Sequence, residues 1–376
     1  MRAITASAAA AALVLSAAAC SSGHGSRTDP SPGLFNHLDA TSWISPDTGW
    51  LLVTRPCGQD GCEALLHTTD AGHSWTRVYM NKEKDGEQTS VWLANASAGY
   101  VADYTGPPHG TTLATSDGGR TWNAPPDAAQ PSGAVQTLDL ASQGGTVLRA
   151  AHQNDPACSN TGDCGDEIQM ATTGSDTWHT VLPPLSHSAS YGQVVWQNDH
   201  VAYGAFLSAV VGPDSHIASF IYRSADAGKS WEPIPDPCDS RRGIAGRLAT
   251  GPGDRLAVLC SGIDDSLYKF VATSTDNGKT WGAPRSLPEH GGITTAVALT
   301  GSTMIAVTKS TVWTSTDDGT SWQPVEALQA DFSDSAFGLY GFNGSDIGEI
   351  VNHQGNTMWT TSDGGQNWSQ LNVSAG

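Results

Sequence analysis

Short apolar runs recur along the chain, and turn-forming residues separate them. Four clear examples are three or four residues long: Ala64–His67, Phe220–Arg223, Lys269–Ala272 and Thr311–Trp313. Each is followed by a polar turn that contains glycine, then by a tryptophan and another short run. Runs this short, bounded by such turns, are typical of β-strands joined in hairpins. The pattern therefore predicts an all-β protein.

The turn itself has a fixed eight-residue form, Ser/Thr-x-Asp-x-Gly-x-x-Trp, which is clearest over Thr361–Trp368. Six copies are intact. Their aspartates and tryptophans are Asp70 and Trp75, Asp117 and Trp122, Asp226 and Trp231, Asp276 and Trp281, Asp317 and Trp322, and Asp363 and Trp368. A shortened seventh copy, Thr172–Trp178, has Gly174 where the aspartate would stand. The copies recur at roughly 40 to 50 residues, a period typical of propellers and other repeat arrays.

Each position in this phrase has a structural explanation. The aspartate carboxylate can accept hydrogen bonds from N–H groups of its own turn. The glycine allows a backbone conformation that a Cβ atom would penalise. The tryptophan closes the loop by burying a large ring beneath it. We therefore interpret the repeated aspartates and tryptophans as structural residues that do not touch a ligand.

The phrase resembles the Asp-box, or BNR, repeat of sialidases, related glycoside hydrolases and sortilin-type receptors. Two copies add an upstream apolar run that ends in glycine and an aromatic residue, at Trp43–Trp50 and Val91–Tyr100. This longer pattern is most like the photosystem II assembly-factor type of propeller, and the resemblance covers residues 41–373. It implies a seven-bladed β-propeller with four antiparallel strands per blade, A to D, and the Asp-box in each C–D hairpin. In the family the Asp-box lies at the bottom outer corner of a blade, away from the ligand face.

We assign the blades from this frame. They are expected over residues 41–80, 89–125, 134–183, 190–235, 245–285, 293–327 and 334–373. In the first blade, strands A to D are expected at Thr41–Ile44, Trp50–Thr54, Ala64–His67 and Trp75–Tyr79. How the ring closes is left open, and Leu34–Leu38 could add a strand to the seventh blade.

The first residues indicate export. A short positive start, Met1-Arg2, precedes an apolar stretch of small residues that ends at Cys20. Such a stretch is typical of a secretory signal, and its end resembles a bacterial lipobox in which Cys20 would be lipidated. Plain cleavage after an alanine is the alternative. We expect a signal peptide over residues 1–20, a flexible tether over 21–40 and one propeller over 41–376, anchored by lipid to the outer face of the cell membrane.

Six further cysteines are an even number in an exported chain, which favours disulfides. Proximity favours three pairs: Cys57 with Cys62, Cys158 with Cys164, and Cys238 with Cys260. All three would lie on the top face, opposite the Asp-boxes. No Cys-x-x-Cys pair with matching histidines occurs, so we predict no metal site and no cofactor.

The formal net charge of −19 and the pI of about 4.7 exclude a basic nucleic-acid-binding surface. The top loops offer cationic and imidazole groups as candidate binding residues. They are Arg55, His109, His152, Arg241, Arg242 and His290. We expect Arg247 to lie with Arg241 and Arg242 in one top connection, whereas a sialidase draws its three arginines from separate blades.

We therefore predict a monomeric binding or assembly scaffold for an envelope protein, a peptide or a glycan, and nominate no catalytic residue. The alternative is a secreted exo-glycosidase of the sialidase-like type, which would need two well-placed carboxylates. Acidic residues are frequent in the top loops, but no spacing singles out a pair.

Overall fold

The computed structural model describes most of the predicted propeller. The described residues are 37–55, 62–81, 88–103, 112–123, 134–154, 165–175, 177–185, 189–210, 216–238, 243–261, 269–288, 296–301, 303–308, 311–329, 347–352 and 357–372. Their regular structure consists of β-strands only. No helix in this part of the chain is long and apolar enough to cross a membrane.

The strands are grouped by sheet. The first two sheets contain β1 (His37–Trp43), β2 (Gly49–Arg55), β3 (Cys62–Thr68), β4 (Thr76–Asn81), then β5 (Gln88–Leu93), β6 (Gly99–Asp103) and β7 (Thr112–Thr115). The third and fourth contain β8 (Ala134–Gln143), β9 (Thr146–Asn154), β10 (Asp166–Thr172), β11 (His179–Leu182), then β12 (Ala189–Trp196), β13 (Ala202–Val210), β14 (His216–Ser224) and β15 (Glu232–Ile234). The fifth contains β16 (Ile244–Thr250), β17 (Leu256–Ser261), β18 (Lys269–Ser274) and β19 (Arg285–Ser286). The last two contain β20 (Ala296–Thr300), β21 (Thr303–Val307), β22 (Thr311–Ser315), β23 (Gln323–Gln329), then β24 (Gly348–Asn352), β25 (Thr357–Thr361) and β26 (Ser369–Asn372).

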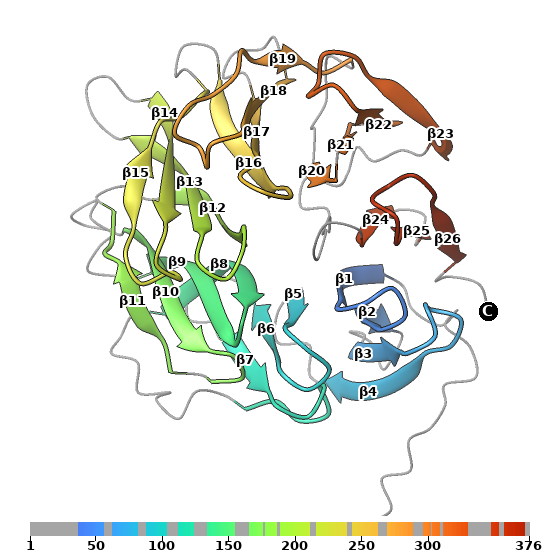
Figure 1. Ribbon diagram of the computed structural model, residues 1–376. Helices are drawn as coiled ribbons and strands as arrows, with labels where there is room; N and C mark the ends of the chain where they lie inside the picture. The colour runs from blue at the N-terminus through green and yellow to red at the C-terminus, as the bar shows by residue number, and fades with distance from the viewer. Residues whose placement is uncertain are drawn as a thin grey trace, which may run out of the picture.

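These seven antiparallel sheets stand around a central axis as the blades of a propeller, which confirms the predicted fold (Figure 1). Five sheets have four described strands and two have three. In the second blade, an isolated bridge between Ala114 and Asn123 stands at the place of strand D. The predicted inner strand of the seventh blade lies before β24, outside the described residues.

The first strand begins earlier than the sequence suggested. It starts at His37, whereas we had placed the end of the tether at residue 40. His37 and Leu38 pair with Thr54 and Val53 of β2, so they belong to the first blade and not to a strand of the seventh. Leu38 is fully buried at the seam between these two blades, which explains why an apolar residue precedes the expected strand.

Each pair of neighbouring blades encloses one cluster of buried apolar side chains, so seven clusters follow one another around the ring. At the closing seam, Val351 and Met358 of the seventh blade pack with Leu38 and Trp43 of the first. No described strand pairs with a strand of another blade. The described seams are therefore held by side-chain packing and hydrogen bonds, without strand exchange.

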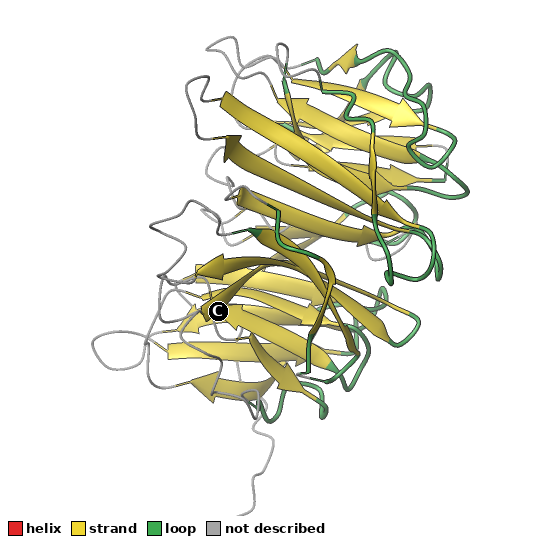
Figure 2. Ribbon diagram, turned by 90° about the vertical axis from the view of Figure 1, so that its left-hand side faces the viewer, coloured by secondary structure: helices red, strands yellow, loops and turns green. Residues whose placement is uncertain are grey.

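The Asp-box turns define one face of the ring. In five blades, an N–H group of the C–D turn, or of its shortened form in the third blade, donates to a carbonyl of the A–B turn of the same blade, as Ala71 does to Asp47 at 3.0 Å. Figure 2 shows most of the described turns gathered at one end of the strands. We call this end the bottom face and the opposite end, where Arg55 and Cys62 are paired, the top face.

The hydrogen bonds within each Asp-box follow the predicted pattern. In the first copy, Thr68 Oγ1 donates to Asp70 Oδ1 at 2.7 Å and accepts from the N–H of Gly72 at 3.0 Å. The N–H of Ser74 donates to Asp70 Oδ1 at 2.8 Å. The same contacts recur in the other five intact copies. Hydrogen bonds from Ser74 lower the pKa of Asp70 to about 2, because they favour its charged form.

The Asp-box glycine also sets the distance between blades. All six glycines have a φ between +78° and +87°. A Cβ atom on each would lie between 2.3 and 3.1 Å from a side chain of the preceding blade. At the closing seam, Gly72 meets Leu371 in this way. The glycine is therefore required twice, for its backbone conformation and because the neighbouring blade leaves no room for a side chain.

An aromatic residue near the start of strand B connects blades at three seams; it follows a glycine in the first two blades and Ala202 in the fourth. Trp50 Nε1 donates to the carbonyl of Gly118 at 3.2 Å, and Tyr203 OH donates to Asn277 Oδ1 at 3.1 Å. Tyr100 OH accepts from the N–H of Gly174 at 2.8 Å. In each case the partner atom belongs to the Asp-box turn, or to its shortened form, in the next blade. The aromatic side chain therefore links strand B of one blade to the C–D turn of the next.

A paired substitution separates the two roles of the glycine. Gly365 and Gly145 both have a φ of +83°, but a Cβ at Gly365 would lie 2.3 Å from Ile305 Cδ1, whereas nothing lies within 4 Å at Gly145. Gly145→Ala should cost about 1–2 kcal/mol, the penalty of the left-handed conformation. Gly365→Ala should cost a further 1–3 kcal/mol or so through overpacking. Urea unfolding followed by tryptophan fluorescence gives the comparison, and equal shifts of the midpoint would contradict this account.

Candidate functional site

The top-face residues nominated from sequence are only partly described. Arg55 is the last residue of β2, and His152 lies on β9. His109, Arg241, Arg242 and His290 lie outside the described residues. The structure therefore provides side-chain geometry for one of the six candidates.

His152 pairs with a buried carboxylate. Its Nδ1 is 2.9 Å from Asp166 Oδ1, and the two side chains are 13% and 1% exposed. This contact fixes the orientation of the imidazole ring. No group of three or more metal-ligating side chains occurs among the described residues. The described residues therefore provide an oriented histidine near the top of the third blade, paired with one carboxylate.

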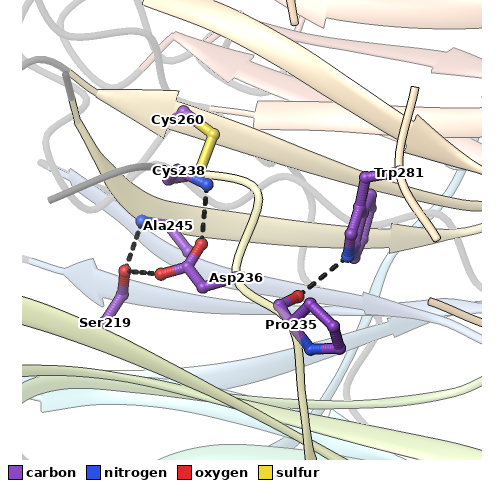
Figure 3. Close-up of a disulfide and its surroundings, with 7 residues drawn as sticks. All are labelled: Ser219, Pro235, Asp236, Cys238, Ala245, Cys260 and Trp281. Carbon is purple, nitrogen blue, oxygen red and sulfur yellow. Dashed lines mark hydrogen bonds between the residues drawn. A yellow bond between two sulfur atoms is a disulfide. The ribbon is translucent and has the colours of Figure 1, made fainter. Parts of the chain in front are cut away.

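A disulfide joins Cys238, after strand β15, to Cys260 on β17, with 5.6 Å between the Cα atoms (Figure 3). It crosses the seam between the fourth and fifth blades, and both side chains are buried. Cys62 is also disulfide-bonded. Cys20, Cys57, Cys158 and Cys164 lie outside the described residues.

The innermost strands carry a feature that the sequence pattern did not suggest. Strands β1, β5, β8, β12 and β16 each contain a β-bulge, and the level of the bulge differs by up to two residues between blades. Bulges bend a strand and re-aim its side chains. The residues that resume pairing after the bulges are Ala40, Ser90, Asp139, Tyr191 and Arg247.

Three of these residues that follow a bulge, in consecutive blades, form a polar cluster that we call the inner cluster: Asp139, Tyr191 and Arg247. The guanidinium carbon of Arg247 lies 4.9 Å from the centroid of the Tyr191 ring, within the range of a cation–π interaction. Burial raises the pKa of Asp139 to about 6, although a hydrogen bond from Val194 and the charge of Arg247 oppose the shift. All three residues retain partial exposure. Arg247 is thus part of an inner strand, not of the top connection to which the sequence assigned it.

Hydrogen bonds across the seams anchor the inner cluster. The N–H of Val194 on β12 donates to Asp139 Oδ2 at 3.0 Å. Gln193 accepts from the N–H of Leu248 on β16 at 2.7 Å and donates to its carbonyl at 3.1 Å. Polar side chains of one inner strand thus hydrogen-bond to N–H and C=O groups on the open edge of the next inner strand. Without these side chains, those backbone groups would lack a partner in the sheet.

A second network holds the bulge that precedes Arg247 (Figure 3). The N–H of Ala245 donates to Ser219 Oγ at 2.9 Å, and that hydroxyl donates to Asp236. Asp236 also accepts from the N–H of Cys238 at 2.8 Å. Ala245 pairs with Cys260, so the disulfide and the three hydrogen bonds together hold the start of β16.

The chemistry of the inner cluster suits binding. No carboxylate of the described residues lies within ion-pairing distance of Arg247. Arg247 shares a side-chain hydrogen bond with Tyr191, so its remaining N–H groups can serve a carboxylate or carbonyl oxygen of a ligand. The cluster contains a single carboxyl group, Asp139, whereas a glycoside hydrolase needs two. Sequence reasoning missed Asp139 and Tyr191 because it took its candidate residues from the top loops, whereas these two residues lie on inner strands.

A buried acid lies at the closing seam. Gly348 faces the Asp-box residue Thr361, just as Gly49 faces Thr68, so Glu349 occupies the position of the aromatic Trp50. Its side chain accepts from Thr41 Oγ1 of the first blade at 3.3 Å. Glu349 is 4% exposed, and burial raises its pKa to about 8.

Comparison with known proteins supports the resemblance seen in the repeats. The sequence profile of photosynthesis system II assembly factor YCF48 matches residues 45–154. Photosystem II assembly lipoprotein Ycf48 of Synechococcus sp. (strain CC9902) is 31% identical over 218 residues. This match covers 50% of the present chain and 59% of the relative, which is less than two thirds of its length. The resemblance to the photosystem II assembly-factor type of Asp-box propeller is confirmed.

Solved structures confirm the fold. The structure of YCF48 bound to a D1 peptide has a TM-score of 0.55 at 17% identity, over 90% of this chain and 95% of that one. An ancestral GH74 enzyme has the same TM-score of 0.55 at 13% identity, over 92% of this chain and 47% of that one. Because an assembly factor and a glycoside hydrolase match equally well, the fold alone does not decide the function.

The acid at the closing seam predicts a pH dependence. Between its ordinary pKa of 4.5 and the raised value of about 8, Glu349 keeps its proton in the folded state and loses it in the unfolded state. This group therefore lowers stability as the pH rises through that window, by about 1.4 kcal/mol per unit. Glu349→Gln should raise the Tm above that of the wild type at pH 8 and leave it unchanged near pH 4. The exposed Glu232→Gln is the control. A difference that stays constant from pH 4 to 8 would refute the assignment.

Proposed function

We propose that this protein is an exported, lipid-anchored scaffold that binds an extended segment of a protein partner at the inner cluster. The observation that carries the proposal is the convergence of Asp139, Tyr191 and Arg247 from three consecutive inner strands. The protein would act as a monomer, since one ring provides the whole cluster.

The relatives support this proposal in two respects. The curated relative is a photosystem II assembly lipoprotein, which supports both an assembly role and a lipid anchor. A solved relative of the same fold is bound to a peptide of D1. We extend to this chain only the general activities, attachment through lipid and capture of a peptide segment.

The inner cluster has the groups that recognise a peptide. Arg247, stacked on Tyr191, offers fixed N–H donors to a carboxylate or a backbone carbonyl. Asp139 can accept from a ligand N–H, or donate when it holds a proton, because its pKa of about 6 lies near neutrality. Anchoring by Val194 and Leu248 keeps these groups in place before binding, which reduces the entropy lost on association.

The binding proposal can be tested with a random peptide library displayed on phage. Selected peptides should share an acidic residue or a free carboxyl terminus. The Arg247→Ala substitution should lower the affinity for these peptides at least tenfold, or by about 1.4 kcal/mol. Arg255→Ala is the matched control, because Arg255 pairs with Asp318 on the bottom face. Equal binding by both variants would refute the site, and turnover of a glycoside panel would favour the exo-glycosidase alternative.

The anchor can be tested separately. Cys20→Ser should move the protein from the membrane fraction to the medium and abolish incorporation of a clickable palmitate analogue. Ser21→Ala, beside the proposed attachment site, should leave both unchanged. Retention of the Cys20→Ser variant in the membrane would show that Cys20 is not the anchor.

A further inference from the structure

The start of β16 is only briefly paired with its own sheet. Ile244 and Ala245 pair with Ser261 and Cys260 of β17, and the β-bulge follows directly. Regular pairing resumes at Arg247. Because a bulge interrupts the ladder of hydrogen bonds, these two residues hold the strand start less firmly than a continuous strand would. The position of the strand start therefore depends on contacts outside the sheet.

Those contacts form a closed circuit across the fourth and fifth blades (Figure 3). The N–H of Ala245 donates to Ser219 Oγ at 2.9 Å, and the Ser219 hydroxyl donates to Asp236. Asp236 accepts from the N–H of Cys238 at 2.8 Å, and Cys238 is disulfide-bonded to Cys260. Cys260 pairs with Ala245, which closes the circuit. The disulfide is the covalent link of this circuit between the two blades.

The same seam separates the two stacked members of the inner cluster. Tyr191 lies on β12 of the fourth blade and Arg247 on β16 of the fifth, with 4.9 Å between the ring centroid and the guanidinium carbon. Arg247 lies two residues after Ala245. The next residue, Leu248, donates its N–H to Gln193 of the fourth blade at 2.7 Å. Since a cation–π contact weakens as the cation leaves the ring face, the hydrogen bonds on both sides of Arg247 set the strength of this stack.

We propose that the Cys238–Cys260 disulfide is a positioning element of the inner cluster, so that the protein binds its ligand with full affinity only after these two cysteines are oxidised. The inference rests on the inner cluster being the binding site of the proposed function, and it adds a control on that site. Asp236 and Ser219 act with the disulfide as positioning residues, because they connect it to the backbone of Ala245. None of these four side chains needs to touch the ligand.

Burial of the disulfide decides when this control acts. Cys238 is 3% exposed and Cys260 is fully buried. Reductants in solution do not reach such a bond in the folded protein, and the labile disulfides of proteins are the strained or exposed ones. The bond therefore forms while the two blades close and then persists. The affinity of the inner cluster is set once, during folding.

The oxidation needs a partner of defined chemistry. The thiolate of one cysteine attacks a disulfide of a thiol–disulfide oxidoreductase, and one sulfur of that enzyme leaves as a thiolate. The second cysteine then attacks the mixed disulfide and releases the other enzyme sulfur. The chain loses two protons and two electrons, and the enzyme disulfide becomes two thiols. Because such oxidation belongs to exported compartments, a chain still in the cytoplasm would have the weaker site.

Amide hydrogen exchange in the full chain tests the positioning without any ligand. In the double variant Cys238→Ala, Cys260→Ala, the amides of Ala245 and Leu248 should exchange roughly tenfold faster than in the wild type, because their hydrogen bonds open more often. Equal exchange of these two amides in the wild type and the double variant would overturn the proposal.

A matched control removes a disulfide from another blade. Cys62 on β3 of the first blade is disulfide-bonded, and Cys57 is its predicted partner. The double variant Cys57→Ala, Cys62→Ala should leave the exchange of Ala245 and Leu248 unchanged. If both double variants accelerate exchange at these amides equally, the disulfide acts through general stability, and the proposal is wrong.

Binding is measured with a fluorescent peptide selected on the wild-type protein, at a temperature well below the unfolding of every variant. Loss of the Cys238–Cys260 bond should lower the affinity roughly tenfold, or by about 1.4 kcal/mol, whereas the control that lacks Cys57 and Cys62 should bind as the wild type does. Unchanged affinity without the Cys238–Cys260 bond would contradict the proposal. If no peptide binds the wild type, the proposed function fails, while the exchange result still decides whether the disulfide positions the strand of Arg247.

Asp236 provides a second test, which applies even if the cysteine variant does not fold. With the disulfide intact, Asp236→Ala should accelerate exchange at Ala245 and weaken peptide binding. Asp236→Asn should restore most of both, because its amide oxygen can accept from the N–H of Cys238 and its amide N–H can donate to Ser219 Oγ. Wild-type exchange and affinity in Asp236→Ala would show that these hydrogen bonds do not position Arg247, and would overturn the inference.

Discussion

The structure depends on the contact between the glycine of each intact Asp-box turn and a side chain of the preceding blade. Six glycines make it, and at Gly365 a Cβ atom would come within 2.3 Å of Ile305. The aspartate closes the turn, and the closed turn presents the glycine to its neighbour. One short phrase therefore sets both the local hairpin and the spacing of the ring. Since no described strand is exchanged between blades, the described seams need such a device to set the distance between side chains that pack across them.

Two buried polar residues, Arg149 and Glu349, lie where the repeat elsewhere places apolar contacts between or within blades. The third blade has the shortened Asp-box, and its tryptophan, Trp178, lies 4.3 Å from the guanidinium carbon of Arg149. Arg149 donates to Gln169, and burial lowers its pKa to about 9. The closing seam has Glu349 where three other seams have an aromatic residue. In both places a polar interaction replaces the usual apolar contact, so the repeat tolerates substitution where hydrogen bonds compensate for burial.

Much of the fold could be predicted because the Asp-box is a local signal: Asp70, Gly72 and their neighbours bond within a single turn. The inner cluster could not be predicted in the same way. Asp139, Tyr191 and Arg247 are far apart in the sequence, and their alignment depends on bulges that shift the register by one residue. A bulge leaves little trace in short strands, since it changes pairing rather than composition. Arg247 was noticed only as a charged residue in a presumed loop.

The Asp-box carboxylates and Arg247 differ in how many of their hydrogen bonds are already formed within the protein, and this difference decides which of them can bind a ligand. On the bottom face, the carboxylates of Asp70, Asp226, Asp276 and Asp317 are charged, with pKa values of about 2, and already accept several hydrogen bonds from their own turns. They have little capacity left for a ligand. Arg247 differs, because it is stacked on an aromatic ring and no described carboxylate lies within ion-pairing distance of it, although it interacts with the charge of Asp139. Since recognition requires groups whose interactions are incomplete before binding, the inner strands are a better location for a ligand than the repeats that build the ring.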